Sequence, residues 1–318
     1  MHDLVAEFKS FFISTVDVVR LDGNDRILGF GRVTRHELEI GPGVGRGVAG
    51  HPPMLNSGQA SVTAQRVAAH RLTFDRLFAP YGDPAADERL YRDLADGSTT
   101  GSGEQMAAYL AARTTFFDRT VVTALDRGVT QVVVAGAGYD GRPWRYAKPG
   151  VRWFELDHPD TQRDKQRRLR RLGIDTDQVT FVPADFTVDQ VGPRLAAAGL
   201  NPTRTSLMLS EGVAAYLDRP VLAALLQGLA EVAAQHSRLA ISLSVATGSP
   251  GLAARRAQFQ AGVAALGEPA RTVLSADDAD PLLVAAGWRP VPTSSEDGPA
   301  RERARKTGLV TAETACPV

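Results

Sequence analysis

A glycine-rich turn after an apolar run is the first feature of this sequence that could do chemistry. The run 131–135 (QVVVA) leads directly into the segment 136–141 (GAGYDG). The run is typical of a buried strand, and glycines in the turn remove side chains that would keep a ligand from the backbone. In open α/β sheets, ligands bind at the carboxyl ends of the strands, where this turn falls. We therefore expect Gly136, Ala137 and Gly138 to contact a small ligand, with a plain tight turn as the alternative.

Two carboxylates follow in the next strand-like run, 151–157 (VRWFELD). They lie about 20 residues after the turn, where nucleotide-binding folds of this type hold the ribose hydroxyls. Adenosine binding is therefore the favoured interpretation. Glu155 and Asp157 point the same way if the strand continues, because side chains alternate along a strand. We expect Asp157 to bind the ribose, with Glu155 as the second candidate.

The same glycines also match the G-x-G-x-x-G pattern of dinucleotide enzymes, with Gly141 as the third glycine. A nicotinamide oxidoreductase using NAD(P) is therefore an alternative. In that motif the turn opens a helix that packs closely on the strand. Here Arg142, Pro143 and Trp144 bring bulk and a proline to this place, so we interpret Gly141 as a coincidence.

The elements that must position these residues alternate between strand and helix along most of the chain. Strand patterns cover 131–135, 151–156, 179–183, 206–209 and 239–245, and helical patterns cover 60–77, 104–125, 160–172, 188–200 and 220–234. Two further short runs, 288–291 and 308–311, would form a terminal hairpin at the sheet edge. This alternation predicts an α/β fold with a doubly wound, mostly parallel sheet.

Composition narrows the function class. The chain has 318 residues, 43% of them hydrophobic and 23% charged, so it can bury a core. Its 36 basic and 36 acidic residues cancel, so no overall charge recruits nucleic acid or an anionic membrane.

The single Cys316 and six scattered histidines lack the spacing of metal ligands, so we expect no metal. With neither a secretory leader nor a membrane-length apolar run, we expect a cytoplasmic protein.

A boundary is expected near the N-terminus, because half of the positions from 41 to 58 are Gly or Pro. The sequence predicts a poorly ordered or hairpin-like extension over 1–55 and a main domain over 56–318. Met54 lies at the far edge of this linker and is an alternative translation start.

With these features, the chain resembles the leucine carboxyl methyltransferase-like family of S-adenosylmethionine-dependent O-methyltransferases, including its bacterial polyketide O-methyltransferase branch. Matching blocks occur in order from about residue 59 to 312: TAQRVA (63–68), ARTTFFD (112–118), the turn and its flanks (131–145), FELDHP with Lys165 (154–165), ADF (184–186) and SEGV with YL (210–217). The resemblance implies a class I methyltransferase-like Rossmann fold whose N-terminal helices cover the cofactor cleft. Two positions depart from the family pattern. Gly141 stands where a hydroxyl residue is usual, and Pro143 stands where a small helix former is common.

The resemblance also implies roles for single residues toward S-adenosyl-L-methionine. Arg113 would hold the methionyl carboxylate in a two-pronged pair, and Asp157 would take the ribose hydroxyls. Asp185 would accept from the adenine amino group, and Phe186 would offer a main-chain donor and an apolar flank. Glu211 would face the ammonium or sulfonium end. The alternatives are a solvated arginine at 113, a helix N-cap at 185 and an ordinary strand-end carboxylate at 211.

The predicted function is O-methylation of a small-molecule hydroxyl or carboxyl group, in secondary metabolism. Within the class, carboxyl methylation of a protein terminus is the alternative, and a non-catalytic sensor that binds the nucleoside is a further one. A carboxylate acceptor is already ionised at neutral pH and needs no base, whereas an alcohol or phenol does. Tyr216 is a weak candidate for contact with the acceptor. We do not expect His158 to be catalytic.

Overall fold

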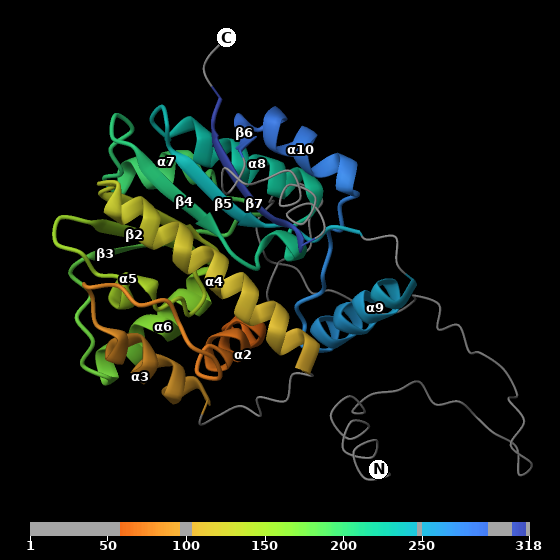
Figure 1. Ribbon diagram of the computed structural model, residues 1–318, viewed down its shortest axis with the longest axis horizontal. Coiled ribbons are helices and arrows are strands. Elements are labelled where there is room, and N and C mark those ends of the chain that lie inside the picture. Colours follow the sequence, from red (N-terminus) through yellow and green to blue (C-terminus); the bar gives the residue numbers. More distant parts are fainter. Residues whose placement is uncertain (1–57, 96–103, 247–249, 292–306, 316–318) are drawn as a thin grey trace, which may run out of the picture. The chain divides into compact units, whose positions relative to one another are not determined.

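A seven-stranded sheet lies at the centre of the computed structural model, which describes residues 58–95, 104–246, 250–291 and 307–315 (Figure 1). The strands are β1 (Gln131–Ala135), β2 (Arg152–Asp157), β3 (Val179–Pro183), β4 (Ser206–Ser210), β5 (Arg238–Ser242), β6 (Trp288–Val291) and β7 (Leu309–Thr314). Their order is β3-β2-β1-β4-β5-β7-β6. Strands β1 to β5 pair in parallel, whereas β7 runs antiparallel to β5 and β6. The predicted doubly wound, mostly parallel α/β fold is confirmed.

The central strand shows why these residues form such a sheet. All five residues of β1 are buried, as expected for a strand covered by helices on both faces. Val132 and Val134 pack with the cluster on one face, and Val133 and Ala135 pack with the cluster on the other.

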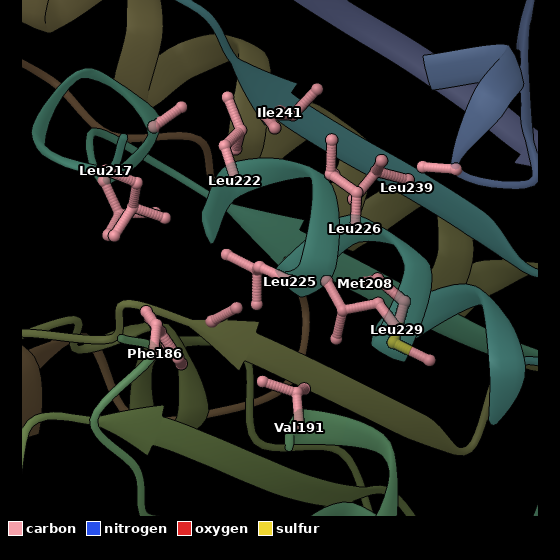
Figure 2. Close-up of a cluster of buried hydrophobic side chains, with 14 of the residues drawn as sticks. Phe186, Val191, Met208, Leu217, Leu222, Leu225, Leu226, Leu229, Leu239 and Ile241 are labelled. Carbon is pink, nitrogen blue, oxygen red and sulfur yellow. The ribbon is translucent and has the colours of Figure 1, made fainter. Parts of the chain in front are cut away.

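Helices fill both faces. They are α2 (Val62–His70), α3 (Pro84–Ala95), α4 (Glu104–Asp126), α5 (Arg142–Arg145), α6 (Pro159–Arg171), α7 (Val191–Ala197), α8 (Arg219–Glu231), α9 (Pro250–Ala265) and α10 (Ala276–Ala285), with a 3₁₀ turn η1 (Ala214–Tyr216). Residues of α3, α4 and α6 join the cluster of Val132, whereas α7, α8 and α10 join that of Val133. In the second cluster, the leucines of α8 lie against Met208 of β4 and Ile241 of β5 (Figure 2). The two layers hold the sheet rigidly and leave the carboxyl ends of its strands to build a site.

Several predicted bounds differ from the observed ones. The helical pattern 60–77 yields α2 alone, which ends at His70, and the pattern 188–200 yields the shorter α7. Strand β5 ends at Ser242 instead of 245. Helices α3, α5, α9 and α10 were not predicted. The predicted edge strands do pair with each other, but β7 lies between β5 and β6. The predicted extension 1–55 lies outside the described residues.

The strand order reverses direction between β1 and β4. Strands β2 and β3 lie on one side of β1, and β4 and β5 lie on the other. Such a reversal is where open α/β sheets bind their ligands. The glycine turn follows β1 and Glu211 follows β4, so the topology brings both to this point.

Candidate functional site

The glycine turn has the backbone conformation that its sequence predicts. Gly136 and Gly138 have φ angles of +72° and +49°, a region that other residues rarely adopt. A Cβ on Gly136 would lie 2.7 Å from the Cβ of Val213, and a Cβ on Gly138 would lie 3.0 Å from the Cβ of Ala64. The turn is therefore a narrow strip of backbone between the segment after β4 and helix α2. Ala137 between them is buried, and its N–H donates to the Leu156 carbonyl at 3.1 Å.

Asp157 joins the turn to the end of β2. Its carboxylate accepts from the backbone N–H of Gly138, and from that of His158 at 2.7 Å. Burial raises the pKa of Asp157 above its usual value, and the two amide donors oppose this rise. The predicted ribose ligand therefore lies directly beside the predicted glycine turn.

Glu155 is engaged differently. Strand β2 continues to Asp157, but the carboxylate of Glu155 lies within 2.8 Å of Lys165 Nζ through both oxygens and is fully buried. Burial raises the pKa of Glu155 to about 7, against the effect of Lys165. Lys165 also donates to the Asp140 carbonyl at 2.8 Å. This arrangement favours a role for Glu155 in clamping α6 to the turn, which leaves Asp157 as the better ribose candidate.

Three arginines surround Glu211 at the end of β4. Its carboxylate lies 3.0 Å from Arg113 Nε, 3.1 Å from Arg71 Nη2 and 2.7 Å from Arg142 Nη1. Burial alone would raise the pKa of Glu211, but the three guanidinium charges outweigh it and hold the pKa well below its usual value. Glu211 is therefore an anion at neutral pH. Arg113 is not a solvated arginine, because its side chain is 10% exposed.

The terminal nitrogens of Arg113 face the segment after β4. A Cβ built on Gly212 would lie 3.3 Å from each of them, and the guanidinium stacks over the Tyr109 ring at 5.7 Å. Arg113 thus contacts Glu211 through Nε, and the edge formed by its Nη1 and Nη2 lies against the backbone of Gly212. A carboxylate at this edge would meet two parallel donors.

Asp185 and Phe186 follow β3, as the sequence indicated. Asp185 Oδ1 accepts from the N–H of Thr187 at 2.9 Å and from its hydroxyl at 2.7 Å. Asp185 is therefore not the N-cap of α7, which begins at Val191 after Gln190. Phe186 is buried in the apolar cluster that includes the leucines of α8 (Figure 2).

The two candidates for contact with the acceptor lie in different surroundings. Tyr216 is in η1, where its phenol contacts the Thr63 side chain and burial raises its pKa. His158 is the N-cap of α6, and its Nδ1 accepts from the Asp160 N–H at 3.3 Å. A neutral phenol can hydrogen-bond to an acceptor but is a poor base at neutral pH. His158 is engaged in capping α6, because its Nδ1 already accepts a hydrogen bond there.

The structure explains the unusual Gly141. A Cβ there would lie 2.3 Å from the Cβ of Asp87 and 2.7 Å from the Tyr91 hydroxyl, both in α3. The N–H of Gly141 donates to the same hydroxyl at 3.0 Å. Gly141 therefore makes room for α3. This packing agrees with our interpretation that the third glycine is not part of a dinucleotide motif.

Sequence reasoning missed Arg71, Arg142 and Asp140. Arg142 is fully buried, with Nε 2.7 Å from Asp118 and Nη1 2.6 Å from Asp140. Asp140 stands in the G-A-G-x-D turn, so its place was a signal that could have been used. No local pattern marks Arg71, since its partner Glu211 lies 140 residues away in the chain.

Within the residues that the structure describes, no helix combines the length and the apolar character needed to cross a bilayer.

Comparisons with known proteins identify the family of this chain. The sequence model described as "Leucine carboxyl methyltransferase" matches residues 60–230, more than half of the chain. A protein of Mycobacterium avium (strain 104) is 33% identical to this chain over 191 residues, which cover 59% of each chain. A protein of Parafrankia sp. (strain EAN1pec) is 36% identical over 173 residues, which cover 53% of this chain and 55% of that protein. Both are provisionally described as S-adenosyl-L-methionine-dependent methyltransferases. The matches thus span less than two thirds of these relatives.

Among solved structures, human N-acetylserotonin methyltransferase in complex with SAM is similar at 15% identity and a TM-score of 0.43, over 73% of this chain and 57% of that one. From the match to the family model, which includes β1 to β4 and their site residues, we conclude that this chain belongs to the leucine carboxyl methyltransferase family.

Proposed function

We propose that this chain binds S-adenosyl-L-methionine across the ends of β1, β2 and β4 and transfers its methyl group to an oxygen of a small molecule. The observation that carries the proposal is the position of the glycine turn. One side of it hydrogen-bonds to Asp157, and the other lies against Val213, two residues after Glu211. A ligand along this turn reaches carboxylates at both ends. Family membership and the descriptions of the relatives support the same activity.

The residues present fit such a ligand. Two buried polar atoms near Glu211, Ser210 Oγ and Arg71 Nε, have no hydrogen-bond partner among the described residues. Buried polar groups normally have partners, so unsatisfied ones at a strand end favour a polar ligand. The missing side chains of Gly136 and Gly138 let Val213 and Ala64 approach the backbone of the turn, so these two residues would border a ligand that lies along it.

In the proposed complex, Arg113 holds the methionyl carboxylate through its terminal nitrogens, and Glu211 balances the ammonium. Asp157 accepts from the ribose hydroxyls, while Ala137 and the flanking glycines line the backbone side. Asp185 and Phe186 lie beyond β3, toward the adenine. When bound, the sulfonium supplies an electrophilic methyl group.

The protein contributes mainly orientation to this transfer. Holding acceptor and methyl group in line and excluding water can supply about 7–11 kcal/mol. Tyr216 can hydrogen-bond to the acceptor as a neutral phenol, but it would not remove a proton. With His158 engaged in its helix cap, an already ionised acceptor oxygen suits the site best.

Calorimetric titration with S-adenosylhomocysteine and, separately, NADH tests this function. We expect binding of the first and none of the second. Binding of NADH alone would favour the oxidoreductase alternative. Binding of S-adenosylhomocysteine, with no methyl consumption against any panel of hydroxyl and carboxyl acceptors, would favour a non-catalytic sensor.

A further inference from the structure

Helix α2 covers the glycine turn and is held at both ends. Near its start, Ala64 contacts Gly138, as described above. Directly after its last residue, Arg71 binds Glu211 at 3.1 Å. Any ligand that lies along the turn must therefore pass under α2, so the contacts that fix this helix control access to the proposed site.

One carboxylate from a distant segment fixes the start of α2. Glu268, 6% exposed, accepts from the N–H of Val62 at 2.7 Å and from that of Thr63 at 3.2 Å. It also accepts from the Ser61 hydroxyl at 2.8 Å and from the Thr63 hydroxyl. The first N–H groups of a helix lack partners within the helix and carry its positive dipole end. A single side chain, 207 residues from Ser61, thus accepts from two of these N–H groups and from two neighbouring hydroxyls.

The segment that carries Glu268 is itself tied to the site. Arg271 and Thr272 donate their N–H groups to the Ala215 carbonyl at 2.7 and 3.1 Å, and Ala215 lies in η1. Thr63 contacts Tyr216 in the same turn. Glu268 therefore connects α2 to the segment that presents Tyr216.

We propose that Glu268 is a positioning residue that latches α2 shut over the glycine turn and sets the rate at which the demethylated cofactor, S-adenosylhomocysteine, leaves. The proposal rests on the function proposed above. Glu268 hydrogen-bonds to Ser61, Val62 and Thr63, none of which we assign to the cofactor, so its loss should loosen α2 without removing a proposed cofactor-binding group. In such a variant, the dissociation rate of S-adenosylhomocysteine should rise although no direct contact to it is lost.

Three variants test this latch. Glu268→Ala removes all four contacts, and Glu268→Gln keeps the size and one acceptor oxygen. The matched control is Asp278→Ala, because Asp278 also caps a helix, α10, through Ser275 at 2.7 Å. Both alanine variants lose a capping carboxylate, but only one of these carboxylates lies at α2.

The first readout is the dissociation rate of S-adenosylhomocysteine by stopped-flow fluorescence. Hydrogen bonds to a charged group are strong enough that losing them should speed release at least about tenfold in Glu268→Ala, with an intermediate rate in Glu268→Gln. Asp278→Ala should release at the wild-type rate. Wild-type release from Glu268→Ala, or an equal acceleration in the control, would overturn the proposal.

The second readout is amide hydrogen exchange over 62–70 in the protein without ligand. We expect faster exchange in Glu268→Ala than in wild type and Asp278→Ala, and unchanged exchange would overturn the latch. This measurement does not depend on the cofactor. Failure of the wild-type protein to bind S-adenosylhomocysteine would overturn the proposed function instead. If Glu268→Ala does not fold, Thr63→Val removes one hydroxyl donor and is expected to give the same changes at smaller size.

Discussion

Replacing Arg113 by alanine is the sharpest test of the proposed cofactor site. Arg113 contacts Glu211 through Nε, and its terminal nitrogens lie against Gly212. The substitution removes the donors that we assign to the methionyl carboxylate and leaves the glycine turn and Asp157 unchanged. Cofactor affinity should therefore fall while the adenosine half of the site persists.

The structure sets the size of the effect. A hydrogen bond to a charged group contributes about 1.5–3 kcal/mol, so a two-pronged pair contributes at least about 3 kcal/mol. Since about 1.4 kcal/mol changes a dissociation constant tenfold, we expect binding to weaken about 100-fold. Glu211 keeps Arg71 and Arg142, so its charge is not left unpaired. The free energy of unfolding should thus fall by about 1–3 kcal/mol, less than for an orphaned buried charge.

Calorimetric titration with S-adenosylhomocysteine measures the affinity, and urea unfolding measures the stability. Arg119→Ala is the matched control, since Arg119 is exposed on the same helix α4. It should change neither quantity. A dissociation constant for Arg113→Ala within about threefold of wild type, in a folded protein, would refute the carboxylate role, because even one charged hydrogen bond contributes more.

Three further predictions follow from the same site. Asp157→Asn should weaken S-adenosylhomocysteine binding about tenfold, because one amide oxygen replaces two carboxylate oxygens, and unchanged affinity in calorimetry would argue against ribose binding. Gly136→Ala should lower the free energy of unfolding in urea by at least about 2 kcal/mol, through its positive φ and its approach to Val213, and adding Val213→Ala should recover part of the loss. The lowered pKa of Glu211 contributes stability that is fully present above pH 4.5 and is lost as the pH falls toward the folded-state pKa. Urea midpoints should drop below pH 4.5, and Glu211→Gln should flatten that drop.

The strands and the glycine turn could be predicted because their signals are local. Strand β1 is apolar after Gln131 and leads into the glycine turn at 136–138, and both β1 and β3 have their predicted bounds, 131–135 and 179–183. The distance after the turn indicated both Glu155 and Asp157, and the structure places Asp157 beside Gly138. Parallel pairing then brings these strand ends to one edge, so the order of elements was enough to place them together.

Helix α3 and the partners of the buried charges could not be predicted in this way. The segment PAADERLYRDLA is rich in charge, which masks the helical spacing of its buried apolar residues Ala86, Leu90, Tyr91 and Leu94. Contacts between Glu268 and Thr63, or between Arg71 and Glu211, join residues that are 205 and 140 positions apart. Pairings of this kind depend on the packed fold, and a single sequence carries no local sign of them.

The arginines around Glu211 differ in burial and in whether their guanidinium groups can contact a ligand. Arg142 is fully buried, and its guanidinium reaches Asp118, Asp140, Glu211 and the Thr114 carbonyl, so it has no edge to turn toward a ligand. Burying this many charges brings little net stability, because apolar residues of similar size often fold as well. What it does provide is a carboxylate whose position and charge are fixed before a ligand arrives, as electrostatic catalysis requires. Glu211 is held from α5 by Arg142, from α4 by Arg113 and from the end of α2 by Arg71. Opening α2 therefore releases only one of its three partners, so the anion stays in place while the proposed site exchanges its ligand.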